Sequence, residues 1–332
     1  MFSICIYCKK SPPDLVPSEA HIFPAALGGT ESSEEIVCVE CNGRINREVE
    51  TPTLPSFAVF RSLFGIAGRR GVPSVPAVAI SEGQETPVSL GPSGLPKGPI
   101  IRVETDGQGK KSYVVYGNDE MIDAFKQKLA AHRPEVVWQE ARSQVAVELV
   151  ADGFGADERL IRRLAAKVVF ERFAQLRGVI AADRDFDVIR DFILTGTESE
   201  PCCGITADPR LLGGSLNFPV PVHAVVIVIH VVDRIVGGFV VFFGLFLYWV
   251  ILSRHYRALG SADDLLLEYP QHRLTQRPLL RSGLGGIRVP WNQLVAEYTS
   301  DPRGVSRAAI NAARLKFQAA VDAAFRESSG TS

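Results

Sequence analysis

The sequence predicts an α+β fold with two parts, a small amino-terminal finger and a larger domain with a β-hairpin and meander core. Two Cys-x-x-Cys pairs enclose a strand-turn-strand pattern before residue 42. Residues 222–253 run apolar with many β-branched and aromatic side chains, as core strands do. Residues 156–176 repeat apolar side chains at the spacing of a core-facing helix.

Composition limits the partners and the compartment. The chain has 332 residues and a formal net charge of −1, so no global field attracts it to nucleic acid or to an anionic membrane. Cys5 follows the initiator methionine too closely for a cleavable leader. Six cysteines are too few for a disulfide scaffold in a chain of this length, which favours metal binding in a reducing compartment. We therefore expect a cytoplasmic protein of about two domains.

The cysteine pairs predict a zinc site. Cys5 and Cys8 form one pair, and Cys38 and Cys41 form the other. Two turns that each donate a thiolate pair satisfy tetrahedral zinc, with Zn–S distances of about 2.3 Å. Two redox motifs are the alternative, but a redox pair normally opens a helix after a strand, and too few residues precede Cys5 for that. Because thiolates fill all four positions, the predicted zinc is structural.

The segment between the cysteine pairs predicts a hairpin. Residues 22–23 suit a strand, and Pro24 limits its ladder. The sequence "LGGT" at 27–30 supplies the positive φ of a turn, and residues 36–39 return as the second strand.

A helix follows the second cysteine pair. In "NGRINREVE", Asn42 and Asn46 are one turn apart on the same face, and Glu50 is one turn further along. Zinc would lock the strand end to the helix start and hold His21 against Asn42 and Asn46.

Four motifs together carry a family resemblance: "CIYC", "SEAHIFP", "LGGT" and "CVECN". Their combination resembles the HNH endonucleases, the ββα-metal or His-Me finger nucleases, in the four-cysteine zinc branch. The resemblance covers roughly residues 5–50. It implies a ββα-metal finger that hydrolyses phosphodiester bonds in DNA.

The resemblance also assigns roles to residues. It implies that His21 is the general base that activates water, and that Asn42 is a ligand of a catalytic Mg²⁺ or Mn²⁺. Asn46 falls where many relatives carry a second helix ligand, and Glu50 is a further candidate. Amide and carboxylate oxygens suit such an ion.

One position departs from the family pattern. Relatives place Asp, Glu or His immediately before the base, where this chain has Ala20. Glu19 is one residue too early, so on a regular strand its side chain points away from the face of position 20, unless a local bulge corrects it. Ala20→Asp is then expected to lower the Mg²⁺ requirement. The alternative function is a non-catalytic zinc finger that binds nucleic acid or protein.

The remaining chain divides at a Pro/Gly/Ser-rich stretch. We expect residues 1–70 to form the HNH nuclease zinc finger domain, 71–98 an irregular connection and 99–332 an α+β domain of unknown role. That last domain is a candidate site for a protein partner. Arg44 and Arg47 on the finger helix offer a narrow phosphate-contacting stripe, or are solvated surface arginines.

Further elements are expected in the larger domain. Residues 100–117 predict a hairpin around Asp106-Gly107, 118–132 a helix and 136–150 a strand. Residues 301–325 predict an amphipathic helix.

Two stretches leave alternatives open. On the helix at 156–176, Arg159, Arg163 and Lys167 lie opposite the apolar face, which favours a solvated face over nucleic-acid contact. The uncharged run at 235–252 reaches the lower length limit of a membrane span. Its β-branched residues and glycines favour core strands, so membrane association is not expected.

Overall fold

The computed structural model describes residues 4–81, 84–92, 96–105, 107–109, 111–133, 136–137, 148–151, 157–207, 218–230, 233–257, 263–276 and 289–329. The chain forms two compact units, one of Met1–Pro55 with Ala156–Ser332, the other of Ser56–Gly155. The finger therefore shares a unit with the carboxy-terminal sheet, and the expected boundary at 71–98 falls inside the second unit. Helices and strands occur in both units, which confirms the α+β class.

The finger has the predicted order of hairpin and helix. Its elements are strands β1 (Pro17–His21) and β2 (Ser32–Cys38), a 3₁₀ turn η1 (Ala25–Leu27), helix α1 (Val39–Ile45), a π-helical segment η2 (Asn46–Glu50) and α2 (Thr51–Thr53). Strands β1 and β2 pair antiparallel, with His21 opposite Ser32.

The first strand lies earlier than predicted. It ends at His21, and beyond it the Ile22 amide still donates to the Glu31 carbonyl at 2.9 Å. The chain then turns over η1, and a Cβ at Gly29 would stand 2.0 Å from the Phe23 carbonyl oxygen. The close backbone approach explains the glycine, and the turn ends the ladder before residues 22–23 can extend it.

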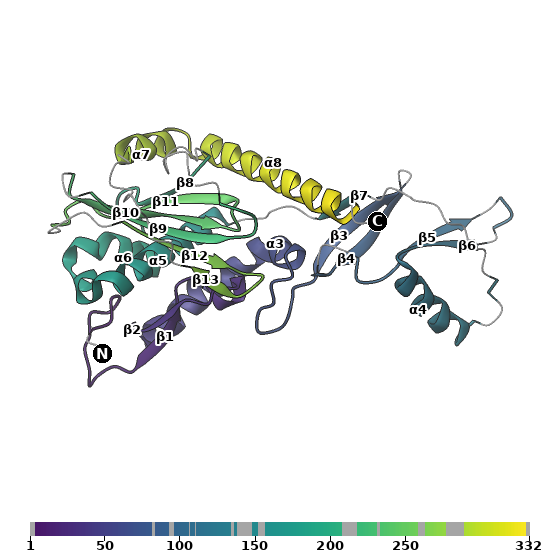
Figure 1. Cartoon of the computed structure of the whole chain (residues 1–332), viewed down its shortest axis with the longest axis horizontal. Helices are drawn as coiled ribbons and strands as arrows, with labels where there is room; N and C mark the ends of the chain where they lie inside the picture. Colours follow the sequence, from purple (N-terminus) through teal and green to yellow (C-terminus); the bar gives the residue numbers. More distant parts are fainter. Residues whose placement is uncertain are drawn as a thin grey trace. The chain divides into compact units, whose positions relative to one another are not determined.

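A six-stranded antiparallel sheet forms the core of the same unit (Figure 1). Its order is β13 (Leu274–Gln276), β12 (Asp263–Tyr269), β9 (His223–His230), β10 (Ile235–Phe242), β11 (Phe246–Ser253) and β8 (Cys203–Thr206). Adjacent strands inside the apolar stretch at 222–253 are thus confirmed. Within the described residues, no helix has the length and apolar character to cross a membrane.

Helices cover both faces of this sheet. A Cβ at Gly237 would meet the Trp291 ring of α7 (Trp291–Ser300), and one at Gly238 would meet Val169 of α5 (Glu158–Arg177) at 2.8 Å. Neighbouring residues of a strand point to opposite faces, so α5 and α7 lie on opposite sides, as Figure 1 shows. Double coverage explains why the strands are apolar without alternation.

The outer helices complete the unit. Helix α8 (Pro302–Ser329) confirms the predicted closing helix and packs with α7 over β8 and β11. On the other face, α5 is followed by the 3₁₀ turns η5 (Gly178–Ala182) and η6 (Arg184–Phe186) and by α6 (Asp187–Thr195).

Helix α5 confirms the predicted helix, but the solvated face expected on it is wrong. Arg163 is only 9% exposed and Lys167 is fully buried. The finger and α6 cover this face, and backbone carbonyls and carboxylates satisfy the two cations. Arg159 alone of the three stays exposed, and it donates to the Gly196 carbonyl at 2.9 Å.

The second unit contains α3 (Ala58–Leu63), the strands β4 (Gln84–Leu90), β3 (Val75–Ser81) and β7 (Glu148–Ala151) in that sheet order, the hairpin β5 (Ile100–Thr105) with β6 (Lys111–Tyr116), and α4 (Asp119–Ala130). A 3₁₀ turn η3 (Leu54–Phe57) precedes it.

These elements confirm the predicted hairpin and the helix expected at 118–132. The stretch expected to be an irregular connection instead holds the β3–β4 hairpin. Ala77 and Ala79 of β3 lie in this hairpin and pair with residues of β4. Asp106 and residues 138–147 of the predicted strand lie outside the described residues.

Candidate metal centre and active site

The four predicted zinc ligands come together. The Sγ atoms of Cys5, Cys8, Cys38 and Cys41 all lie within 4.8 Å of one another. Cys8 Sγ and Cys38 Sγ are 4.0 Å apart. A tetrahedral zinc with bonds of about 2.3 Å separates its sulfur ligands by about 3.8 Å, so the cluster fits zinc by donor type and by spacing.

Local backbone structure presents each pair of thiols. In the first turn, the Lys9 amide donates to the Cys5 carbonyl at 2.9 Å, and Lys9 takes a φ of 60° to close the turn. In the second, Cys38 is the N-cap of α1, and its sulfur accepts from the Cys41 amide at 3.5 Å. A helix amino terminus stabilises a thiolate, which is the form that binds zinc.

The thiols also interact with each other. A hydrogen bond from Cys41 lowers the pKa of Cys5 to about 5, against the opposing effect of burial. The pKa of Cys41 is raised because its proton is held in that bond. Zinc binds cysteine as the thiolate, so zinc binding would release the protons that these thiols hold.

His21 and Glu19 lie on one face of the hairpin. The β1–β2 register shifts between Ser18 and Ala20, but the extra residues lie on β2, between Ser33 and Val37. Strand β1 therefore keeps its alternation, and Glu19 does not share the face of Ala20. Glu19 Oε1 accepts from Ser32 Oγ at 2.8 Å, and Ser32 is the cross-strand partner of His21. Cross-strand partners point to the same side of a hairpin, so the Glu19 carboxylate reaches the His21 face. Ala20 is fully buried on the other side.

Asn42 connects this strand to the helix. Its side-chain nitrogen donates to Ser18 Oγ and to the Glu19 carbonyl, both at 2.9 Å. Because both amide hydrogens bind β1, Oδ1 is the end of the side chain left to accept or to ligate. The structure therefore places the Asn42 side chain against the backbone of β1 at Glu19.

The other two candidate ligands are engaged elsewhere. Asn46 is exposed, and its Oδ1 accepts from Thr51 Oγ1 at 2.9 Å. Glu50 Oε1 lies 2.9 Å from Lys167 Nζ, and its side chain is 17% exposed. Of the predicted helix ligands, Asn42 is thus the one that the structure places against β1.

Lys167 of α5 is a site residue that the sequence analysis missed. Its Nζ donates to the backbone carbonyls of His21 and, at 3.1 Å, Ile22. It also lies 2.9 Å from Glu171 Oε2. The signal available in the sequence was the Lys167–Glu171 pair, two opposite charges one helical turn apart with only apolar residues at 168–170 between them.

Burial and neighbouring charges have opposite effects on the pKa values of Glu171 and Lys167. Burial raises the pKa of Glu171 to about 7, although Lys167 opposes the shift. Burial lowers the pKa of Lys167, but Glu171 and Glu50 outweigh it and the net shift is upward. Tyr7 donates its hydroxyl to Glu171 Oε1 at 3.0 Å, and Tyr7 lies between two of the zinc-site cysteines.

A buried histidine anchors the loop that follows His21. His223 Nδ1 accepts from the Phe243 amide at 3.2 Å, so Nε2 carries the proton and donates to the Leu27 carbonyl at 3.0 Å. Its ring stacks on Phe23 with centroids 5.0 Å apart. Burial lowers the pKa of His223 to about 4, which keeps it neutral.

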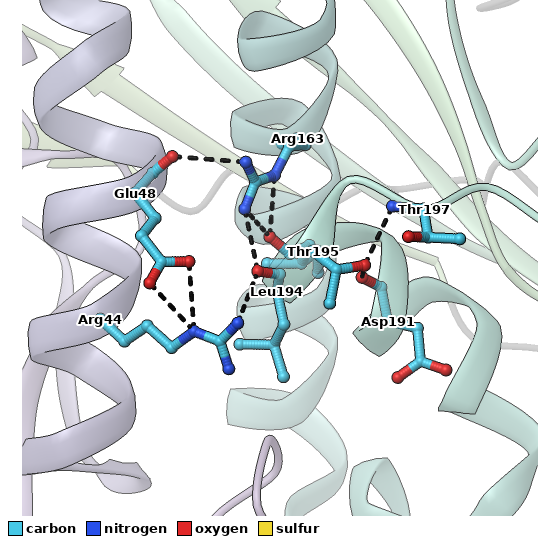
Figure 2. A network of polar contacts seen from close by, with 8 residues as sticks. Arg44, Glu48, Arg163, Asp191, Leu194, Thr195 and Thr197 are labelled. Carbon is cyan, nitrogen blue, oxygen red and sulfur yellow. Dashed lines mark hydrogen bonds and ion pairs between the residues drawn. The ribbon is translucent and has the colours of Figure 1, made fainter.

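Two arginines fix the finger helix to the end of α6 (Figure 2). Arg163 donates to the Ile193 and Leu194 carbonyls at 2.8 and 3.1 Å. Arg44 donates to the Leu194 carbonyl at 3.1 Å and pairs with Glu48 at 3.2 Å. Arg44 therefore caps a helix carboxy terminus, which removes it from the predicted phosphate stripe, whereas Arg47 is exposed.

Comparison with known proteins gives one result. The family model described as HNH endonuclease matches residues 5–57, which contain all four cysteines, Glu19, His21 and Asn42. No curated protein and no solved structure matches the chain. Residues 5–57, with their zinc-type cysteine cluster, are thus similar to the HNH endonucleases.

Proposed function

We propose that this protein is a metal-dependent endonuclease that hydrolyses phosphodiester bonds in DNA. The observation that supports it most is the common face of His21 and Glu19, with Asn42 bound to the same strand. The family match supports nuclease chemistry for the same segment.

Each residue has a distinct duty in this proposal. The His21 imidazole takes a proton from the attacking water. The Glu19 carboxylate and the Asn42 amide oxygen would hold Mg²⁺ or Mn²⁺. When bound, this ion supplies positive charge at the phosphate and at the leaving 3′ oxygen. The thiolate cluster holds a separate, structural zinc.

A plasmid-nicking assay tests the proposal. Wild-type protein should nick supercoiled plasmid with Mg²⁺ or Mn²⁺ and lose activity in a chelator that leaves the zinc in place. His21→Ala should lower the rate by about 100-fold or more with unchanged zinc content, because general bases contribute about 10²–10⁴-fold. His132→Ala, at an exposed histidine of the other unit, is the matched control and should nick normally.

Two results would contradict the proposal. Undiminished nicking by His21→Ala would remove His21 from the chemistry. DNA binding without cleavage in either metal would establish the alternative, a zinc finger that binds but does not cut.

A further inference from the structure

We propose that Lys167 is a positioning residue of the nuclease site, which fixes the direction of His21 by holding the backbone carbonyls of His21 and Ile22. This inference rests on the proposed function. It gives α5 a duty in catalysis, although α5 lies outside the segment 5–57 that carries the candidate base.

The end of β1 needs such a support. Strand pairing with β2 stops at the His21–Ser32 pair, so the ladder no longer fixes the chain after His21. One backbone hydrogen bond, from the Ile22 amide to the Glu31 carbonyl, continues the contact with the second strand. The carbonyls of His21 and Ile22 both accept from Lys167 Nζ, and this shared donor fixes the orientation of the two peptides that flank Ile22.

Lys167 also connects this strand end to the helical side of the site. Glu50 closes the π-helical segment that begins at Asn46, and its carboxylate is 2.9 Å from the ammonium. The ammonium has three hydrogens, and carbonyls and carboxylates surround it. Lys167 Nζ thus joins the end of β1 to the helical segment that continues from α1, the helix that carries Asn42.

The energetic cost of the arrangement argues for a specific role. Lys167 and Glu171 are both fully buried, and a buried ion pair is often no more stable than apolar residues of the same volume. An apolar residue at 167 would pack in the sheet-facing helix but would leave the His21 and Ile22 carbonyls without a donor. The charged residue is therefore explained better by the geometry it imposes than by the stability it adds.

The test compares full-length variants below their melting temperatures. Lys167→Met alone leaves Glu171 buried without its counter-charge, so Lys167→Met/Glu171→Gln is the informative variant, with Glu171→Gln as its parent. Arg162→Met is the matched control, because Arg162 is another buried cation of α5 that binds the Cys203 carbonyl at 2.7 Å and touches no finger residue among its recorded contacts.

The expected result is a split between kinetic constants. In the double variant, kcat for plasmid nicking should fall about 10- to 100-fold, because a displacement of about 1 Å in a reacting group has effects of that size. KM for the plasmid and the zinc content should stay within about twofold of wild type, because substrate binding and the thiolates are untouched. Arg162→Met should keep its kcat even where it lowers the melting temperature as much.

A spectroscopic readout separates this inference from the proposed function. With labelled histidine, the ring signal of His21, assigned through His21→Ala among the 6 histidines, should move in the double variant and stay in Arg162→Met. Wild-type kcat in the double variant, an unmoved His21 signal, or an equal kcat loss in Arg162→Met would each overturn the positioning role. Failure of wild-type protein to nick would reject the proposed function, and the His21 signal would still decide whether Lys167 sets the ring.

Discussion

At the scale of single residues, the neighbours of His21 decide which side chains could hold the proposed catalytic ion. Ala20 is fully buried, while Glu19 is exposed on the His21 face. Residues i and i+2 of a strand share a face, so Glu19 supplies a carboxylate on the His21 side without the family's usual residue at position 20. The earlier expectation for Ala20→Asp changes accordingly.

Glu19→Ala should raise the Mg²⁺ concentration needed for half-maximal nicking by about tenfold, with no change in melting temperature, because an exposed ligand is lost. Ala20→Asp should instead destabilise the protein by about 2 kcal/mol or more, since it buries a carboxylate without a partner. Metal titrations and thermal melts of both variants check this. A normally folded Ala20→Asp protein with a lower Mg²⁺ requirement would show that position 20 faces the ion.

A second residue-scale prediction concerns Glu268 on β12. It is fully buried, its Oε1 accepts from the Glu31 amide at 2.9 Å, and Oε2 has no partner among the described atoms. Burial raises its pKa from 4.5 to about 7. The folded state therefore binds this proton more tightly than the unfolded state, so stability is lost as pH rises from about 4.5 through about 7.

Glu268→Gln should remove this loss. The variant should be more stable than wild type by about 3 kcal/mol at pH 8, and the difference should vanish near pH 4.5, where both side chains are neutral. Urea unfolding at the two pH values measures it, with exposed Glu34→Gln as the control. A pH-independent difference would mean that Glu268 is not protonated on folding.

At the scale of elements, tight strand packing predicts which glycines are required. A Cβ at Gly238 would stand 2.3 Å from the Val226 carbonyl oxygen, so Gly238→Ala should destabilise the sheet by about 1–3 kcal/mol. Gly43 in α1 is the control, since a Cβ there meets only the end of the Arg47 side chain at 3.4 Å. Gly43→Ala should stabilise by about 0.5–1 kcal/mol. Denaturant unfolding of the two variants should give opposite signs, and equal signs would contradict the packing.

The sequence predicts elements well where the signal is local. The strands at 222–253, the helix at 156–176 and the cysteine cluster follow from β-branched runs, helical spacing and paired thiols within short windows. Sheet order does not follow, because β8 pairs with β11 and β12 pairs with β9, and the strands of each of these pairs are not neighbours in sequence.

The contacts of Lys167 could not be predicted from the sequence for a similar reason. Its partners His21 and Ile22 lie on a distant segment of the chain. A charged residue opposite the apolar face of a helix has the same local sequence pattern whether water or another segment of the chain covers it. Only the packing of the finger on α5 distinguishes the two cases.

At the scale of the whole molecule, the finger and the carboxy-terminal sheet form one compact unit. Lys9 of the first cysteine turn pairs with Asp187 at 2.5 Å, and Arg190 donates to the Ile6 carbonyl at 2.6 Å, so the zinc turn is fixed to α6. Loss of zinc should therefore lower the thermal stability of the sheet as well as that of the finger.

Complete removal of zinc should lower the midpoint of the tryptophan-fluorescence melt by roughly 5 °C or more, because each kcal/mol shifts a domain of this size by about 2–4 °C. Trp249 in β11 and Trp291 in α7 report on the sheet and are distant in sequence from the cysteines. Re-addition of zinc should restore the midpoint. A sheet that melts at the same temperature with and without zinc would show that the two parts fold independently.

The central claim is that one finger holds two metals with separate duties, a structural zinc on the cysteines and a catalytic ion beside His21. Anomalous X-ray diffraction from crystals grown with Mn²⁺ tests it most directly, because data at the zinc and manganese absorption edges locate each metal. We predict a zinc peak about 2.3 Å from each of the four Sγ atoms. We predict a separate manganese peak in contact with Glu19 and Asn42 on the His21 face. A cysteine cluster without zinc, or a His21 face that binds no manganese at saturating concentration, would contradict the account.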